Sequence, residues 1–346
     1  MKVLLIFSSS DIGGAEKSLS KIVASNNDKD IEYVVSTFGG SGAFTEFALK
    51  IGLSIEKMGY SYLKLFLYLY RIKPSVVYVI GFRISLVLRF MKFFLPFRYL
   101  IQGVRWNPNS STKLDKVFRF FESNFGSLID GYIVNSKTTL NTMRSIQNKN
   151  IRLIYNGIVS KKNKKHSREK VVLTIANIRE RKGYIEYLEA VKIVLDSIPD
   201  AKFLFLGKDY LDGKLHQKIR AEKLENNIDI LGYKGNVDKY FASSSVFALP
   251  SIHGEGCPTS ILEAFTNHTP VVAFDIDGVS ELVNNNKDGF IVEVKNYKEF
   301  ASKIISLLNN SEMSIRMGDL GSKKVQLLFS LDKAIDEHNK FFKEFI

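Results

Sequence analysis

Short apolar runs of strand length alternate with helix-period segments along the whole 346-residue chain. Continuous apolar strands separated by helices are typical of parallel sheets that helices cover on both faces. The pattern therefore predicts an α/β chain, and its length allows two domains of about 150 residues each. We expect strands near residues 3–7, 33–36, 76–80, 99–102, 131–134, 152–155, 171–175, 202–206, 228–231, 246–249 and 271–274.

The charge of the chain changes sign along its length. Residues 1–160 carry +11, residues 161–170 carry +5 and the remainder carries −3, which gives the net +13. A short lysine-rich stretch between two apolar-periodic halves predicts an exposed linker. We therefore expect a first domain over 1–160, a basic linker over 161–170, a second domain over 171–330 and a C-terminal helix over 331–346. Both domains are expected to be Rossmann-like and doubly wound, with ligands at the carboxyl ends of their strands in a central cleft.

Residues 57–113 combine cations with aromatic side chains and contain no Asp or Glu. Ten Lys and Arg interrupt the apolar runs before they reach the roughly 18 residues of a spanning helix. The combination favours a surface that meets anionic lipid headgroups, with Arg89, Lys92 and Arg98 as the expected contacts. Two alternatives stay open. The aromatics can instead form a core with solvated cations, or the segment can form a single-strand nucleic-acid groove, for which the chain has no recognised motif.

Cysteine and histidine usage limits the metal chemistry that we expect. Cys257 is the single cysteine, which excludes a disulfide framework and a cysteine-based zinc cluster. The five histidines show no ligand spacing. Asp275 and Asp277 have the spacing of a metal-binding DxD motif, but their flanks favour a loop that leads to a helix. We expect neither a metal nor a cofactor. Because the chain opens on a strand-like run, we also expect no secretory leader and a reducing cytoplasm.

Residues 249–265 give the strongest indication of chemistry. A strand is followed by a glycine-containing loop, and Pro258 suits the first turn of a helix. Backbone N–H groups around Gly256, together with the positive end of the helix dipole, would form an anion site suited to a diphosphate. Glu255 in the loop and Glu263 in the helix would bind two hydroxyl-bearing parts of the same ligand. The alternative is an ordinary Gly-Pro turn with two surface glutamates.

Glu255 and Glu263 have the spacing of an E-x7-E motif, and with residues 269–283 they resemble the family 4 retaining glycosyltransferases of the GT-B fold. Four further segments match that family in order, namely residues 13–16, 134–137, 155–158 and 182–183. The resemblance covers nearly the whole chain, is dense over residues 175–283 and is thin over residues 38–102. It implies transfer of a sugar from a nucleotide-sugar to an acceptor with retained anomeric configuration.

The resemblance also implies roles for individual residues. Glu263 would hydrogen-bond the nucleotide ribose, Glu255 would bind the donor-sugar hydroxyls, and Lys182 would neutralise the diphosphate. In this family no protein nucleophile is expected, because the leaving phosphate is thought to take the proton of the acceptor. The remaining donor-binding candidates are Gly14, Gly256, Cys257, Thr259 and His253. Cys257 is expected to pack against its neighbours rather than to react. For His253, the alternative to a donor contact is a purely structural role.

Two positions depart from the family pattern. The family's diphosphate arginine corresponds to Asn177, so Arg179 or Arg181 is expected to reach the phosphates from nearby. The family's N-terminal histidine falls in residues 102–106, where Arg105 is expected to contact a phosphate or a sugar. A lipid-facing role for Arg105 is the alternative.

The resemblance and the basic first half together predict a metal-independent transferase of a hexose or N-acetylhexosamine. We expect a UDP-sugar donor and a lipid-linked oligosaccharide acceptor in polysaccharide synthesis of the capsule or O-antigen type. The enzyme would be cytoplasmic and peripheral on the inner face of the plasma membrane, with no nucleic-acid partner. The alternatives are a sugar-nucleotide epimerase or other GT-B enzyme, and a non-catalytic protein that binds nucleotide-sugars.

Overall fold

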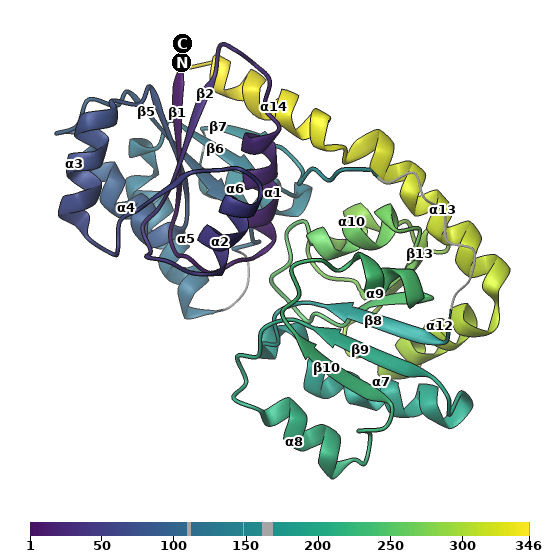
Figure 1. Ribbon diagram of the computed structural model, residues 1–346. Coiled ribbons are helices and arrows are strands. Elements are labelled where there is room, and N and C mark those ends of the chain that lie inside the picture. Colours follow the sequence, from purple (N-terminus) through teal and green to yellow (C-terminus); the bar gives the residue numbers. More distant parts are fainter. Residues whose placement is uncertain (109–111, 148, 161–168, 346) are drawn as a thin grey trace. The chain divides into compact units, whose positions relative to one another are not determined.

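The chain forms two compact units in the computed structural model, which describes residues 1–108, 112–147, 149–160 and 169–345 (Figure 1). Unit 1 comprises Met1–Gly157 together with Leu331–Ile346, and unit 2 comprises Ile158–Ser330. The C-terminal segment therefore belongs to the first unit rather than to a part of its own. Of the basic linker expected at 161–170, residues 161–168 lie outside the described residues.

Unit 1 contains a seven-stranded sheet in which every pairing is parallel, in the order β3-β2-β1-β4-β5-β6-β7. The order reverses between β1 and β4, which is the switch point where doubly wound folds bind ligands. The strands are β1 Lys2–Phe7, β2 Glu32–Thr37, β3 Ile55–Lys57, β4 Val76–Ile80, β5 Tyr99–Val104, β6 Gly131–Val134 and β7 Asn150–Leu153. The helices are α1 Gly14–Ala24, α2 Ala43–Lys50, α3 Tyr62–Ile72, α4 Phe82–Met91, α5 Lys113–Phe125, η1 Gly126–Leu128, α6 Lys137–Ile146 and α14 Leu331–Lys343.

Unit 2 contains a six-stranded parallel sheet in the order β10-β9-β8-β11-β12-β13. This is the Rossmann strand order 3-2-1-4-5-6, with its switch point between β8 and β11. The strands are β8 Val171–Ile175, β9 Lys202–Leu206, β10 Ile228–Gly232, β11 Val246–Leu249, β12 Val271–Phe274 and β13 Gly289–Val292. The helices are η2 Glu180–Lys182, α7 Tyr184–Ser197, α8 Lys214–Ala221, α9 Asp238–Ser243, α10 Thr259–Thr266, α11 Val279–Leu282, α12 Tyr297–Asn309 and α13 Ser311–Leu328.

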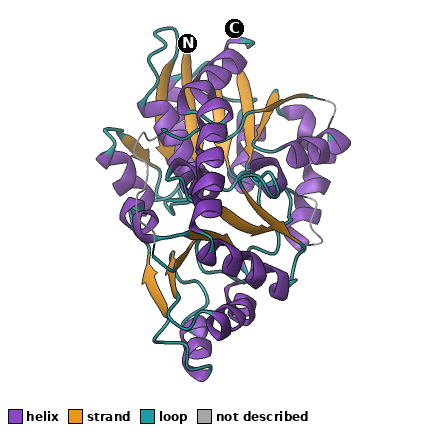
Figure 2. Cartoon of the chain, turned by 90° about the vertical axis from the view of Figure 1, so that its right-hand side faces the viewer, coloured by secondary structure: helices purple, strands orange, loops and turns teal. Residues whose placement is uncertain are grey.

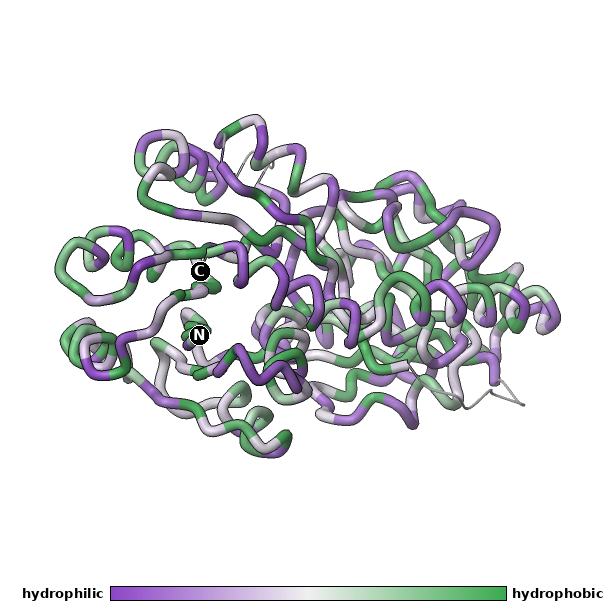
Figure 3. Tube along the Cα trace, turned by 90° about the horizontal axis from the view of Figure 1, so that it is seen from above, coloured by the Kyte–Doolittle hydropathy of each residue, from purple (hydrophilic) through white to green (hydrophobic). Residues whose placement is uncertain are grey.

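Helices cover both faces of the unit 1 sheet, as the continuous apolar strands predict (Figure 2). Alternate residues of β4 enter two separate cores: Val77 and Val79 face α3 to α6, whereas Val76 and Tyr78 face α1, α2 and α14. Hydrophobic and hydrophilic residues alternate along the helices (Figure 3), as amphipathic helices that pack on a sheet require. The prediction of two Rossmann-like domains with a C-terminal helix that packs back on the protein is confirmed.

The basic aromatic segment divides between core and surface. Tyr68 and Phe97 are buried, whereas Phe93 and Phe94 are 69% and 76% exposed. The expectation that Arg89 contacts lipid is wrong, because α4 turns this side chain towards the sheet, where it is fully buried. Within the described residues, no helix is both long and apolar enough to cross a bilayer.

A buried ion pair replaces the expected lipid contact of Arg89. Arg89 Nη2 lies 2.5 Å from Glu122 Oε1 and 2.8 Å from Gln102 Oε1, and all three side chains are buried. Tyr132 Oη donates to the other Glu122 oxygen at 2.6 Å. Lys92, the second expected lipid contact, pairs with Asp130 at 2.5 Å. The network therefore joins α4 and α5 to the sheet.

Candidate functional site

Two loops meet at the switch point of the unit 2 sheet. Residues 176–183 follow β8 and lead into α7, and residues 250–258 follow β11 and lead into α10. Because β8 and β11 are neighbours in a parallel sheet, their carboxyl ends lie at the same edge and bring the two loops together. These loops carry most of the site residues that the sequence predicts in this unit.

Lys182 and Glu255 form an ion pair between the two loops. Both side chains are largely buried, with 12% and 8% of their surfaces exposed. Ser251 Oγ donates to the same Glu255 oxygen at 2.7 Å. The structure thus brings together the two residues that the sequence assigns to the diphosphate and to the donor sugar.

Backbone contacts fix the position of this pair. Ile252 N donates to Arg181 O at 2.9 Å, and Arg181 Nη1 donates to Gly254 O at 2.8 Å. The Asp277 carboxylate accepts the backbone N–H groups of Gly254 and Glu255 at 2.8 and 3.0 Å. Asp277 therefore holds the loop that presents Glu255, a role that its DxD spacing does not indicate. The described residues contain no group of three or more His, Cys, Asp or Glu side chains placed to hold a metal ion.

Gly183 allows the two loops to approach closely. Its φ is +66°, in the left-handed region, and an added Cβ would lie 2.3 Å from Pro250 O. Any side chain here would both strain the backbone and push the β11 loop away. The glycine next to Lys182 is thus a requirement of the site geometry.

The electrostatics of the pair follow from burial and from the neighbouring arginines. Burial raises the pKa of Glu255, but Lys182 and Arg181 outweigh it, so this pKa lies below its usual value. Burial lowers the pKa of Lys182, as do Arg181 and Arg179, while Glu255 opposes the shift. The site therefore holds the Glu255 carboxylate next to Lys182 and Arg181, an arrangement suited to an anionic ligand that also carries hydroxyl groups.

The other predicted residues of this unit occupy different places around the loops. Asn177 Oδ1 accepts from Lys208 N at 3.2 Å, and the Arg179 guanidinium lies 3.8 Å from the centre of the Tyr210 ring. Arg181, by contrast, contacts the Glu255 loop directly. Gly256 and Cys257 are buried, Thr259 begins α10, and His253 is exposed.

Glu263 lies on α10, in the second turn from its N-terminus, and is partly buried. Sequence reasoning missed its neighbour Tyr233, which directly follows β10. Burial raises the pKa of the Tyr233 phenol, and the Glu263 carboxylate raises it further, so the two groups lie near each other. Tyr233 is 40% exposed, which leaves part of its ring available to a ligand. The available indication was a tyrosine at the carboxyl end of a strand, which is the edge of a parallel sheet where ligands bind.

Gly14 and Arg105 lie in unit 1, at the carboxyl edge of its sheet. Gly14 begins α1 after β1, and Arg105 directly follows β5. Glu16 accepts the N–H of Gly13 at 3.0 Å and caps α1. The Arg105 guanidinium donates to Tyr78 Oη at 2.5 Å and to Asn156 Oδ1 at 3.3 Å. Arg105 is therefore held on the sheet edge and not extended into solvent.

A comparison with protein families finds a match in the second half of the chain. Residues 157–324 match the family model described as "Glycosyl transferases group 1". An uncharacterized glycosyltransferase of Haemophilus influenzae is 28% identical over 202 residues, which cover 58% of this chain and 55% of that protein. A second relative is the Escherichia coli protein named "UDP-Gal:alpha-D-GlcNAc-diphosphoundecaprenol alpha-1,3-galactosyltransferase". It is 26% identical over 170 residues, which cover 48% of this chain and 43% of that protein. The chain thus spans about half the length of these relatives.

The fold has close counterparts among solved structures. Anabaena Alr3699/HepE, crystallised with UDP and glucose, superposes with a TM-score of 0.85 over 99% of both chains at 19% identity. The two parallel-sheet Rossmann-like domains and this superposition establish the GT-B fold for this chain.

Proposed function

We propose that the chain is a family 4 retaining glycosyltransferase that transfers a hexose or N-acetylhexosamine from a nucleotide-sugar. The observation that carries the proposal is the Lys182–Glu255 pair, held between the β8 and β11 loops at the switch point of the unit 2 sheet, within the residues that match the group 1 family model. Lys182 neutralises the diphosphate as the glycosidic bond breaks, and Glu255 binds the hydroxyls of the donor sugar. Preorganised positive charge at the leaving group lowers the barrier because the negative charge grows there in the transition state.

The remaining donor contacts follow from the same two loops. Arg181 replaces the family arginine that is absent at Asn177, because its side chain already reaches the Glu255 loop. The N-terminus of α10 offers the backbone N–H of Thr259 to the diphosphate, and Glu263 binds the ribose. We favour a UDP-sugar, since the structurally similar HepE was crystallised with UDP. The reaction is proposed to need no metal ion.

The Glu263 role predicts a loss of nucleotide affinity. Glu263→Ala removes a charged hydrogen bond to the ribose and is expected to weaken UDP binding by more than about tenfold. Isothermal titration calorimetry with UDP and EDTA measures this change. Glu186→Ala, on the exposed side of α7, is the matched control and should bind as the unaltered protein does. Equal affinity in Glu263→Ala and the control would remove Glu263 from the ribose site.

We place the acceptor on unit 1 and infer that it is a lipid-linked oligosaccharide of the capsule or O-antigen type. The support is an exposed surface of this unit that combines aromatics with cations, which we call the basic aromatic surface. Phe90, at the end of α4, contacts Phe125 of α5, and Phe120 contacts Phe121 on the same helix. Its exposed members are Phe90, Phe93, Phe94, Leu114, Val117 and Phe120, with Arg83, Lys116 and Arg119 among them. Such a surface suits an anionic cytoplasmic membrane face.

The basic aromatic surface predicts binding to anionic vesicles. Lys116→Glu with Arg119→Glu reverses two exposed charges on α5 and should weaken binding to phosphatidylglycerol vesicles at least tenfold, since each basic residue near such a surface contributes about 1 kcal/mol. Vesicle sedimentation measures the loss. The matched control is Lys214→Glu with Arg220→Glu, two exposed cations of α8 in unit 2. Equal losses in both double variants would contradict a role for this surface, and UDP binding should be unchanged in either.

A further inference from the structure

Arg105 is a cation whose described hydrogen-bond partners are all neutral. They are the Tyr78 phenol, the Asn156 amide and the His338 imidazole, whose Nε2 lies 3.4 Å from Arg105 Nη2. Burial raises the pKa of Tyr78, so its hydroxyl stays protonated. The guanidinium is thus fixed in place without a counter-charge from the groups that fix it. Its Nε is buried and has no hydrogen-bond partner among the described residues.

The His338 side chain has one defined tautomer in this arrangement. His338 Nδ1 lies 2.7 Å from Ala334 O, and a carbonyl oxygen only accepts, so Nδ1 carries the hydrogen. Nε2 is then a lone-pair acceptor and faces the Arg105 N–H. Burial, followed by the positive charge of Arg105, lowers the pKa of His338 to about 3, which keeps the ring neutral at physiological pH.

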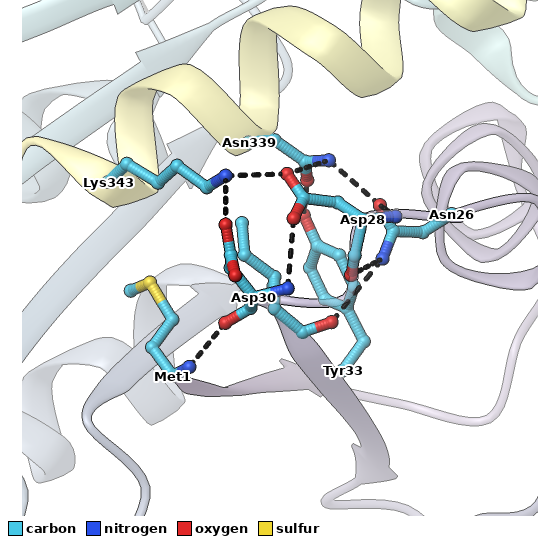
Figure 4. Close-up of polar contacts among 8 residues, drawn as sticks. Met1, Asn26, Asp28, Asp30, Tyr33, Asn339 and Lys343 are labelled. Atoms are coloured by element: carbon cyan, nitrogen blue, oxygen red, sulfur yellow. Dashed lines mark hydrogen bonds and ion pairs between the residues drawn. The ribbon is translucent and has the colours of Figure 1, made fainter.

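His338 reaches Arg105 from a helix that is remote in sequence. It lies on α14, which packs beside α1 on unit 1 (Figure 1). Polar contacts fix this helix against the segment between α1 and β2 (Figure 4). Asn339 Nδ2 donates to Asn26 Oδ1 at 2.8 Å, and Lys343 Nζ pairs with Asp28 at 2.8 Å. Phe341 and Phe342 of the same helix are fully buried in the core. The imidazole is therefore held by an anchored helix.

We propose that His338 is a positioning residue for the proposed reaction: it orients Arg105 so that the guanidinium faces the anionic group of a substrate at the carboxyl edge of the unit 1 sheet. Among the described residues Arg105 forms no ion pair, and the Glu16 carboxylate acts on it only through space. The inference rests on the proposed function for its catalytic consequence, but the orientation of Arg105 is a property of unit 1 alone. A neutral acceptor suits this task because it directs the guanidinium without neutralising it. A carboxylate in the same place would compensate the charge that the substrate has to meet.

Three variants test the proposal through activity. His338→Leu removes the acceptor while keeping an apolar side chain, and is expected to lower kcat/KM for sugar transfer about tenfold, as loss of one hydrogen bond to a charged group does. His338→Gln retains an acceptor for Arg105 and should restore most of that loss. In an Arg105→Met background, His338→Leu should have no further effect, because the two residues act as a unit. UDP affinity should be unchanged in His338→Gln, which keeps Arg105 in its position.

A second measurement separates failure of this inference from failure of the proposed function. The Arg105 side-chain N–H signals, assigned by their absence in Arg105→Met, should be resolved in 1H–15N spectra of the unaltered protein and of His338→Gln. They should be averaged in His338→Leu, where only the bonds to Tyr78 and Asn156 still restrain the guanidinium. If the signals are resolved in the unaltered protein and averaged in His338→Leu, but no sugar transfer occurs, then His338 does orient Arg105 and the transferase proposal fails. Resolved signals in His338→Leu, or equal activity losses with and without Arg105, would overturn the inference.

Discussion

Glu122→Gln is expected to lower the free energy of unfolding by about 3–5 kcal/mol, because it leaves the Arg89 guanidinium charged and buried without a counter-ion. Both side chains are fully buried, so water cannot replace the lost carboxylate. Two nitrogen atoms of Arg89, Nε and Nη1, already have no hydrogen-bond partner in the part of the chain that the structure describes. Urea unfolding followed by circular dichroism measures the change.

Two further variants identify the cause of that loss. Glu32→Gln breaks the exposed pair with Lys2 and should change the free energy of unfolding by less than about 1 kcal/mol. Arg89→Met combined with Glu122→Leu removes both charges and should recover most of the stability lost in Glu122→Gln. If the double variant were as unstable as Glu122→Gln, the lost stability would come from the broken polar network and not from the unpaired charge of Arg89.

Lys182→Met is expected to lower kcat about 10²–10³-fold, since it removes the cation that meets the leaving diphosphate. The change also removes the largest of the interactions that lower the pKa of Glu255, so this pKa should rise, although Arg181 still opposes the effect of burial. Single-turnover measurements at saturating donor isolate this effect from donor binding. Lys192→Met, an exposed lysine of α7 that pairs with Glu222, is the matched control. A kcat equal to that of the control would contradict a catalytic role for Lys182.

The buried parallel strands were predictable because their apolar pattern is local. Residues 76–80, 131–134, 171–175, 202–206, 246–249 and 271–274 form strands with the expected bounds. Two strands were missed, β3 and β13, and the one expected at 152–155 lies at Asn150–Leu153. β3 has only three residues, none of them fully buried, at the edge of its sheet. Short edge strands lack the apolar run on which such a prediction depends.

The burial of Arg89 was not predictable from charge pattern alone. Its partner Glu122 is 33 residues away, on another helix, and the intervening segment contains no indication of the pair. Exposed aromatic and aliphatic residues on α3, such as Tyr62 and Leu63, also obscure the helical period. The sequence therefore favoured a lipid-facing surface and left an aromatic core as an alternative, whereas the structure divides the segment between core and surface.

The site was predictable where motifs lie on adjacent loops and not where contacts span the chain. Lys182 and Glu255 were assigned from short motifs, and the strand order brings them together. The backbone role of Asp277 and the proximity of Tyr233 to Glu263 depend on how separate loops pack. His338 and Arg105 are 233 residues apart, so only the folded chain reveals their contact.

The central claim is that the chain breaks the bond between a sugar and a nucleoside diphosphate. A mass-spectrometric screen of UDP-, GDP- and ADP-sugars with EDTA present tests it most directly, with Lys182→Met as the inactive reference. The proposal predicts slow release of UDP from one UDP-sugar by the unaltered protein and none by the variant. Release by both proteins at equal rates, or no release from any donor even when lipid-linked oligosaccharide acceptors are added, would contradict the claim.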